Sequence, residues 1–126
     1  MILVDTSVWV SHLHNSNSKL EQLLNDGDVV CHPFIIGELA CGNIKNRRVI
    51  LSLLSSLPMV EVIDNEEVLL FIENKNLMGK GIGLIDVHLL ATTLLNEVSL
   101  WTLDTKLQHA AAILRIAYKK IGPASN

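Results

Sequence analysis

The chain has little cysteine. Its 126 residues include two, Cys31 and Cys41, which lie ten positions apart without a second pair or a CxxC motif. This spacing fits neither a zinc site nor the disulfide framework of a small secreted domain. We therefore expect two buried free thiols in a reducing compartment.

Positive charge and long apolar runs are also lacking. Ten Lys and Arg residues stand against 13 Asp and Glu, and the formal net charge is −3. This balance excludes a general electrostatic attraction to nucleic-acid phosphate, so any nucleic-acid contact must be local or assisted by a metal ion. Asp5 interrupts the apolar N-terminus, and the other apolar segments are too short to cross a bilayer. We expect a cytoplasmic protein with no signal peptide and no membrane contact.

The chain does have enough apolar material for one core. Apolar residues make up 49% of the sequence and charged residues 18%. Residues 1–126 are therefore expected to form a single domain that buries about two thirds of its unfolded surface.

Strand and helix patterns alternate along the sequence. Short β-branched runs predict strands at 2–4, 29–32, 60–63 and 99–104, with a short edge strand at 116–118. Helical spacing of apolar residues predicts helices at 16–26, 33–40, 46–56, 64–77, 84–97 and 105–114. This order favours an α/β fold with a mostly parallel sheet of four to five strands, covered by helices on both faces. In such folds the site lies at the carboxyl ends of the strands.

Four acidic residues occupy unusual places in this pattern. Asp5 and Asp104 come directly after predicted strands, Glu38 is the only charge in an apolar helix, and Asp86 stands where another helix begins. Each has an ordinary explanation when taken singly: a turn residue, a helix cap or a solvated helix position. Together they lie on four separate elements that the expected topology brings to one end of the sheet.

Such a cluster repels itself. Two carboxylates about 5 Å apart oppose each other by roughly 3 kcal/mol at an effective dielectric constant of about 20, so the set needs a cation or a bound proton. Oxygen ligands without His or Cys suit Mg²⁺ or Mn²⁺ better than zinc. A cation held in this way usually acts on phosphate, and phosphodiester hydrolysis is the natural reaction. Nearby hydroxyls that would orient carboxylates or water are Thr6, Ser7 and Thr102.

Four separated motifs carry a family resemblance. The stretches "LVDTSVWV", "IGELACG", "GIGLIDVHLLATTL" and "LWTLDTKL" resemble PIN-domain ribonucleases, and VapC-type toxins in particular. The resemblance covers nearly the whole chain in the right order and spacing.

The resemblance implies a three-layer α/β/α fold and an endoribonuclease that depends on Mg²⁺ or Mn²⁺. It also implies a cognate antitoxin that blocks the acidic pocket, and a homodimer, with which the mean hydropathy of +0.37 is compatible. Carried over by motif, the metal ligands and catalytic acids are Asp5, Glu38, Asp86 and Asp104. Thr102 matches the hydroxyl that commonly precedes the last aspartate, and Thr6 follows the first. Some members carry a further acid where this chain has Thr105 and Lys106, so one or two metal ions are both compatible with the sequence.

Other residues have weaker claims on the site. Arg47 and Arg48 belong to one of two local basic concentrations and are weak candidates for contacting an RNA backbone. His88 follows Asp86 by two positions, but a helix-surface or packing role is the simpler one for it. Trp9 and Trp101 are expected in the core or at a dimer interface.

Three other functions fit parts of the pattern. An aspartyl-phosphate phosphatase would use an aspartate after the first strand but needs a second one at position 7, which is Ser. A phosphoacceptor receiver domain would need paired acids after the first strand and a Lys after a late strand. A non-catalytic PIN-like interaction module would keep the fold and lose the chemistry.

Overall fold

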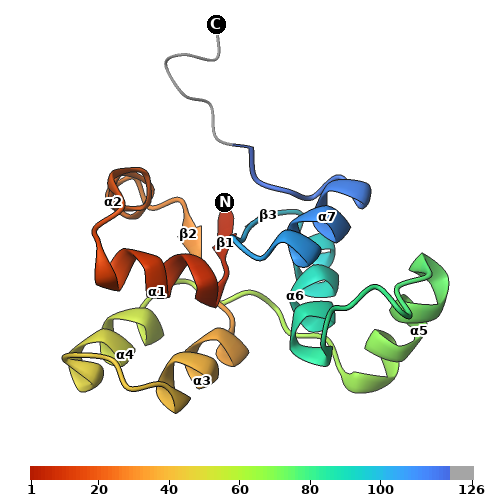
Figure 1. Ribbon diagram of the computed structural model, residues 1–126, viewed down its shortest axis with the longest axis horizontal. Coiled ribbons are helices and arrows are strands. Elements are labelled where there is room, and N and C mark those ends of the chain that lie inside the picture. Colours follow the sequence, from red (N-terminus) through yellow and green to blue (C-terminus); the bar gives the residue numbers. More distant parts are fainter. Residues whose placement is uncertain (120–126) are drawn as a thin grey trace, which may run out of the picture.

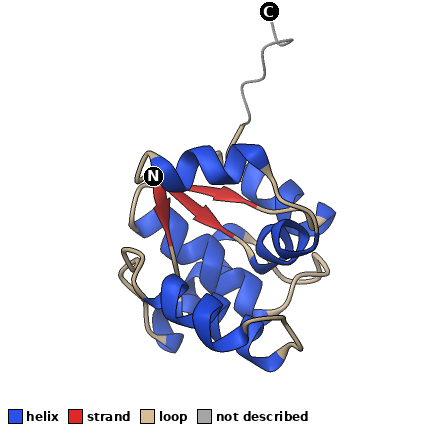
Figure 2. Cartoon of the chain, turned by 90° about the vertical axis from the view of Figure 1, so that its left-hand side faces the viewer, coloured by secondary structure: helices blue, strands red, loops and turns tan. Residues whose placement is uncertain are grey.

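A small parallel sheet forms the centre of the computed structural model, which describes residues 1–119. The strands are β1 (Ile2–Val4), β2 (Val29–Val30) and β3 (Ser99–Trp101), in the spatial order β2-β1-β3. Ile2 pairs with Val29 on one side and with Ser99 on the other. Figure 2 shows the three strands side by side and fanned out by their twist. The expected α/β class is confirmed.

Helices cover the sheet from two sides. In chain order they are α1 (Thr6–His14), α2 (Ser18–Asn25), α3 (Pro33–Cys41), α4 (Arg47–Ser55), α5 (Asn65–Lys75), α6 (Leu84–Leu95) and α7 (Thr105–Ile113). Figure 1 shows α1 to α4 on one side of the strands and α5 to α7 on the other. The layers are therefore α/β/α.

The sheet is narrower than expected. Of the five predicted strands, 60–63 is absent and the bridge of Cys31 with Met59 lies just before it, while 116–118 is reduced to the bridge of Leu100 with Ala117. Next to the first bridge, the backbone N–H of Glu61 donates to Asn96 Oδ1 at 2.9 Å, and Asn96 Nδ2 donates to the Glu61 carbonyl at 3.0 Å. The side chain of Asn96, which directly follows α6, thus takes the backbone groups that a longer strand would have used, which leaves three strands within residues 1–119.

Helix α1 is missing from the expected elements. Its β-branched and aromatic residues have strand propensity, yet they lie in a helix that buries Val8 and Trp9. Tertiary packing has overridden local preference here. Each helix that was predicted is present, with ends that differ by at most two residues.

The core is continuous from the sheet into α6. Leu3, Val4 and Leu100 of the sheet are fully buried, and α6 buries every residue from 87 to 93. Trp9 and Trp101 are buried too, which places both in the core. Within residues 1–119 no helix is both long and apolar enough to cross a membrane.

The two cysteines differ. Cys31 is fully buried, and burial raises the pKa of its thiol to about 11. Cys41 is exposed at the end of α3, so the expectation of two buried thiols is wrong for it. Both are free, because no partner lies in bonding position.

Candidate active site

The four acidic residues come from four elements that surround the carboxyl edge of the sheet. Asp5 directly follows β1 and precedes α1, and Asp104 directly precedes α7, three residues after β3. Asp86 lies in the first turn of α6, and Glu38 lies in α3. The parallel topology predicted this convergence, since every strand runs the same way.

Asp5 is the buried anchor of the site, with 6% of its surface exposed. Its Oδ2 accepts from the hydroxyls of Ser7 and Thr102, each at 2.7 Å. Ser7 Oγ accepts in turn from the N–H of Leu103 at 2.9 Å, and Thr102 Oγ1 accepts from the N–H of Asp104 at 3.1 Å. Each hydroxyl therefore donates its one proton to Asp5 and accepts a backbone N–H, which fixes the orientation of the carboxylate.

Glu38 is tied to the same end of the sheet by one hydrogen bond. Thr6 Oγ1 donates to Glu38 Oε1 at 2.6 Å across 32 positions of sequence. Because Thr6 directly follows Asp5, this bond holds α3 against the start of α1. The half-buried Glu38 is therefore fixed beside Asp5 and is not a freely solvated helix residue.

Asp86 and Asp104 lie at helix N-termini, where peptide dipoles favour negative charge. Asp86 Oδ2 accepts from the N–H of Gly83 at 3.2 Å, and Asp104 Oδ1 accepts from the N–H of Leu107 at 3.0 Å. The capping role expected for each residue on its own is thus present. It uses one oxygen of each carboxylate.

The pKa of Asp86 is raised above its ordinary value. Loss of solvation on burial is the largest cause, opposed by the hydrogen bond from Gly83, and the negative charges of Asp5 and Asp104 add to the rise. Three carboxylates are therefore close enough to repel one another. Within residues 1–119 none of them forms an ion pair with a basic side chain.

The donor set suits a hard divalent cation. One oxygen of each of the four carboxylates is held by a hydrogen bond, and the other has no hydrogen-bond partner within the described residues. Unpaired negative oxygens without imidazole or thiolate are the ligands that Mg²⁺ and Mn²⁺ prefer. No three His, Cys, Asp or Glu side chains in residues 1–119 already stand together as a metal-holding group. Mg²⁺ commonly keeps several waters and takes only one or two carboxylates directly, so the acids fit it in this arrangement.

The chain is similar to known proteins over a stretch that includes the four acidic residues. The sequence matches the PIN domain family over residues 2–113. The chain belongs to the PIN-domain family. Curated PIN-domain relatives include the proteins named Ribonuclease VapC32 from two strains of Mycobacterium tuberculosis, CDC 1551 / Oshkosh and ATCC 25618 / H37Rv. Each is 44% identical over 113 residues, which cover 89% of this chain and 91% of the relative. The resemblance to VapC-type PIN domains is confirmed.

The two arginines considered as RNA contacts, Arg47 and Arg48, lie on α4. Arg47 donates from Nη2 and Nε to the carbonyl of Ala40, at 3.0 and 3.3 Å, and so holds the start of α4 to α3. Arg48 is exposed. Their contact with a substrate stays a prediction.

Two buried histidines contact the same aromatic ring. His32 and His88 both pack against Phe34, with ring centroids 4.9 Å apart in both pairs. His32 Nε2 and His88 Nδ1 are buried and have no hydrogen-bond partner within the described residues. The packing role expected for His88 agrees with this placement. The isolated position of His32 in the sequence carries no signal of its burial.

Proposed function

We propose that this PIN domain is a metal-dependent endoribonuclease that hydrolyses RNA phosphodiester bonds and acts as the toxin of a toxin–antitoxin pair. One observation carries the proposal. Asp5, Asp86 and Asp104 are close enough to repel one another, Glu38 is hydrogen-bonded to Thr6, the residue after Asp5, and each of the four carboxylates is fixed through one oxygen while the other is left unpaired. The name of its 44% identical relatives, Ribonuclease VapC32, supports the same activity.

Some residues of the site would hold the metal ion, and others fix the orientation of the carboxylates. Asp5, Glu38, Asp86 and Asp104 would hold Mg²⁺ or Mn²⁺, which when bound supplies the positive charge that activates a water molecule and stabilises charge developing on the phosphate. Thr102 and Ser7 keep the Asp5 carboxylate oriented by donating to it, and Thr6 does the same for Glu38. In the reaction, a water oxygen bonds to phosphorus while a bond from phosphorus to a ribose oxygen breaks.

Single-stranded RNA is the substrate that we propose. The net charge of −3 gives no general attraction to a polyanion, so approach of the RNA depends on the cation and on local basic groups. An unpaired strand can adapt its backbone to a small pocket more readily than a duplex. We propose that the protein acts on this substrate in the cytoplasm.

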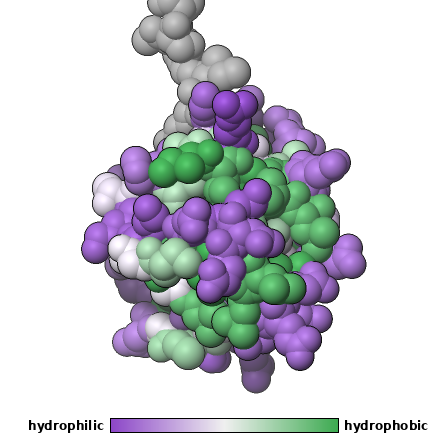
Figure 3. Space-filling view, turned by 90° about the vertical axis from the view of Figure 1, so that its right-hand side faces the viewer, coloured by the Kyte–Doolittle hydropathy of each residue, from purple (hydrophilic) through white to green (hydrophobic). Residues whose placement is uncertain are grey.

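An antitoxin and a second copy of this chain are the proposed protein partners. Large apolar side chains are exposed on α4 and on the face formed by α5 and α6: Val49, Leu53, Leu69, Leu70, Leu94 and Leu95. Figure 3 shows the second of these surfaces as green side chains among purple ones. Extended apolar surface of this kind is typical of proteins that are covered by partners. Light scattering of the chain alone and with the product of the neighbouring gene tests both partners.

The proposed activity is tested with purified protein and Asp5→Asn. The wild type is incubated with single-stranded and structured RNAs, in Mg²⁺ and in EDTA, and cleavage is expected only with metal. Asn keeps an oxygen acceptor for Ser7 and Thr102, so Asp5→Asn is expected to fold and to lose cleavage. Asp26→Asn, on an exposed residue at the end of α2, is the matched control and keeps full activity.

Two outcomes would overturn the proposal. Cleavage by Asp5→Asn at the wild-type rate would remove the acidic site from the reaction. Metal binding by calorimetry without cleavage of any RNA would assign the chain to the non-catalytic interaction modules. Mapping new 5′ ends in cellular RNA after brief induction would identify the substrate.

A further inference from the structure

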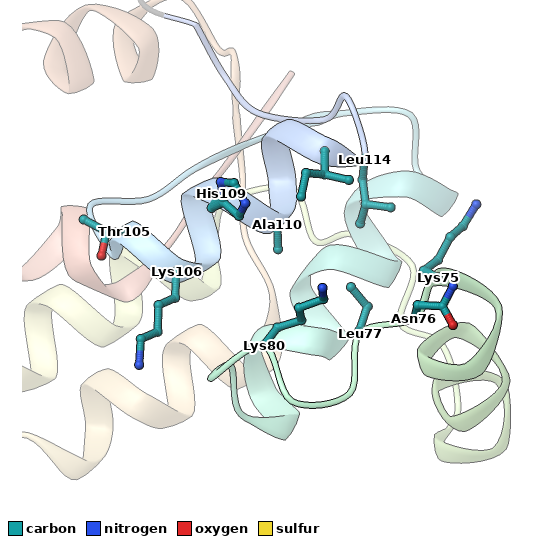
Figure 4. Close-up of a pocket in the computed structure, with 10 residues that line it drawn as sticks. Lys75, Asn76, Leu77, Lys80, Thr105, Lys106, His109, Ala110 and Leu114 are labelled. Atoms are coloured by element: carbon teal, nitrogen blue, oxygen red, sulfur yellow. The ribbon is translucent and has the colours of Figure 1, made fainter.

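A groove with several basic side chains runs between α7 and the segment that joins α5 to α6. Its volume is about 300 Å³. Lys75, Lys80, Lys106 and His109 line it, together with the apolar side chains of Leu77 and Ala110. Figure 4 shows Lys106 and His109 on α7 facing the segment that carries Leu77 and Lys80. The groove thus has an apolar floor and a basic rim.

The groove lies next to the acidic site. Thr105 also lines it and directly follows Asp104, so the first turn of α7 belongs to both. Lys80 lies in the glycine loop that leads to Gly83, whose N–H binds Asp86. Two elements that deliver catalytic acids therefore also form the walls of the groove.

Lys106 lies against the glycine loop at Gly81, which has no side chain. A Cβ on Gly81 would lie 2.9 Å from Lys106 Cδ and 3.0 Å from its Nζ, so the flexible Lys106 side chain would have to move away. Gly81 also has a φ of +77°, which favours glycine. The loop conformation thus makes room for the ammonium of Lys106 at the border between groove and acids.

The groove concentrates charge that the rest of the chain lacks. Lys75, Lys80 and Lys106 are three of the ten Lys and Arg residues of an acidic protein. None of the described residues that line the groove is acidic. An anion beside the carboxylates would meet repulsion, whereas the lysines that line this groove would attract it.

We propose that this groove binds the nucleotide next to the cleaved bond, with Lys80 and Lys106 on its phosphate and its base against Leu77, Ala110 and His109. The proposal rests on the proposed ribonuclease function. It explains how an acidic protein holds a polyanion: the acids take the scissile phosphate with their cation, and the groove takes the neighbouring phosphate directly. Lys and Arg contacts to phosphate position a strand without reading its sequence.

The first test removes two positive charges from the groove. Lys80→Gln/Lys106→Gln is expected to raise KM several-fold for a single-stranded RNA and to leave kcat nearly unchanged. Lys19→Gln/Lys45→Gln removes two charges outside the groove and is the matched control. The slope of log affinity against log salt, measured with the same RNA in Asp5→Asn protein, is expected to become shallower by about 0.7 in the groove variant, since both lysines contact one phosphate and each neutralised phosphate of a single strand contributes about 0.7.

The second test displaces Lys106 without changing any charge. Gly81→Ala is expected to raise KM, because its Cβ would occupy the place of the Lys106 side chain. Gly79→Ala is the control: Gly79 has a similar φ of +70° but open space around the Cβ position. Both variants carry similar backbone strain, so only the contact with Lys106 separates them.

The results distinguish this proposal from the proposed function. If the wild type cuts RNA and the groove variant has the KM and salt slope of the control variant, the groove is not a substrate site. A lowered kcat with unchanged KM would also overturn it, because the lysines would then act on the chemistry. If the wild type cuts no RNA, the ribonuclease function itself fails.

Discussion

At the scale of single residues, the geometry of the site depends on the acceptors to which hydroxyl groups donate their protons. Ser7 and Thr102 each have one hydroxyl proton, and both protons are directed to Asp5 Oδ2. The sequence offers both as hydroxyls near the acids, but it does not indicate that they share one carboxylate oxygen, because one follows β1 and the other follows β3. The shared target becomes visible only when the two strand ends are side by side.

Thr102→Val tests this account with a side chain of nearly the same shape. The variant loses a hydrogen bond to a buried charge and the acceptor of the Asp104 N–H, so we expect a loss of about 1.5–3 kcal/mol in unfolding free energy. We also expect ribonuclease activity to fall about 10–100-fold, as for other residues that orient metal ligands. Thr93→Val is the control, since Thr93 is equally buried and donates to the Leu89 carbonyl at 2.5 Å, remote from the acids. A folded Thr102→Val with full activity would contradict the role.

His32 gives the protein a predictable sensitivity to acid. Its Nδ1 accepts from the N–H of Phe34 at 2.9 Å and its ring is fully buried. Burial, and then the charge of His88, lowers the pKa of His32 from 6.5 to about 4. Between pH 6.5 and about 4, His32 is therefore protonated in the unfolded chain but neutral in the folded chain. The free energy of unfolding has the full contribution of His32 above pH 6.5 and falls as the pH drops toward 4. The loss amounts to about 3 kcal/mol, at 1.36 kcal/mol per pH unit.

Urea unfolding between pH 7 and pH 4 measures this effect. His32→Asn keeps an acceptor for the Phe34 N–H and removes the titrating ring, so its stability is expected to fall less steeply with acid. His14→Asn, on an exposed residue of α1, should follow the wild type. Parallel curves for wild type and His32→Asn would show that His32 does not set the acid limit.

At the scale of elements, Asp104 has a capping role and a proposed catalytic role at once. Asn caps helices about as well as Asp, so Asp104→Asn should leave the unfolding free energy within about 0.5 kcal/mol of wild type. Its loss of charge should abolish most RNA cleavage. Asp64→Asn is the matched control, because Asp64 caps α5 through the Glu67 N–H at 2.8 Å and lies outside the site. Wild-type cleavage by Asp104→Asn would leave Asp104 as a cap alone.

The elements that the sequence predicted well are those with strong local signals. Asp64 and Pro33 mark helix starts, Gly27 has the positive φ expected at a helix end, and the apolar residues of 84–95 form a buried helix. The elements that it missed were decided by distant partners. Residues 6–14 prefer strands locally but pack as a helix, and the Glu61 backbone binds Asn96 instead of extending the sheet.

At the scale of the whole molecule, parallel topology made the acidic site predictable. Once strands alternate with helices, Asp5 and Asp104 must lie at the same edge. The hydrogen bond of Thr6 to Glu38 depends on how α3 packs against α1, and the groove beside α7 depends on the path of the glycine loop. Neither packing nor loop path has a local sequence signal, so both needed the structure.

Convergence of the acids has a cost in folding that a cation should offset. The pKa of Asp86 is raised, so its negative charge disfavours the folded state at neutral pH. In EDTA at pH 7, Asp86→Asn is therefore expected to be more stable than wild type, and the gap should close as pH falls below the ordinary pKa of Asp, 3.8. Mg²⁺ at about 100 times its Kd should stabilise the wild type by about 2.7 kcal/mol, or several degrees in Tm, and the variant by less. Equal Mg²⁺ shifts in both proteins would mean that the ion binds away from these acids.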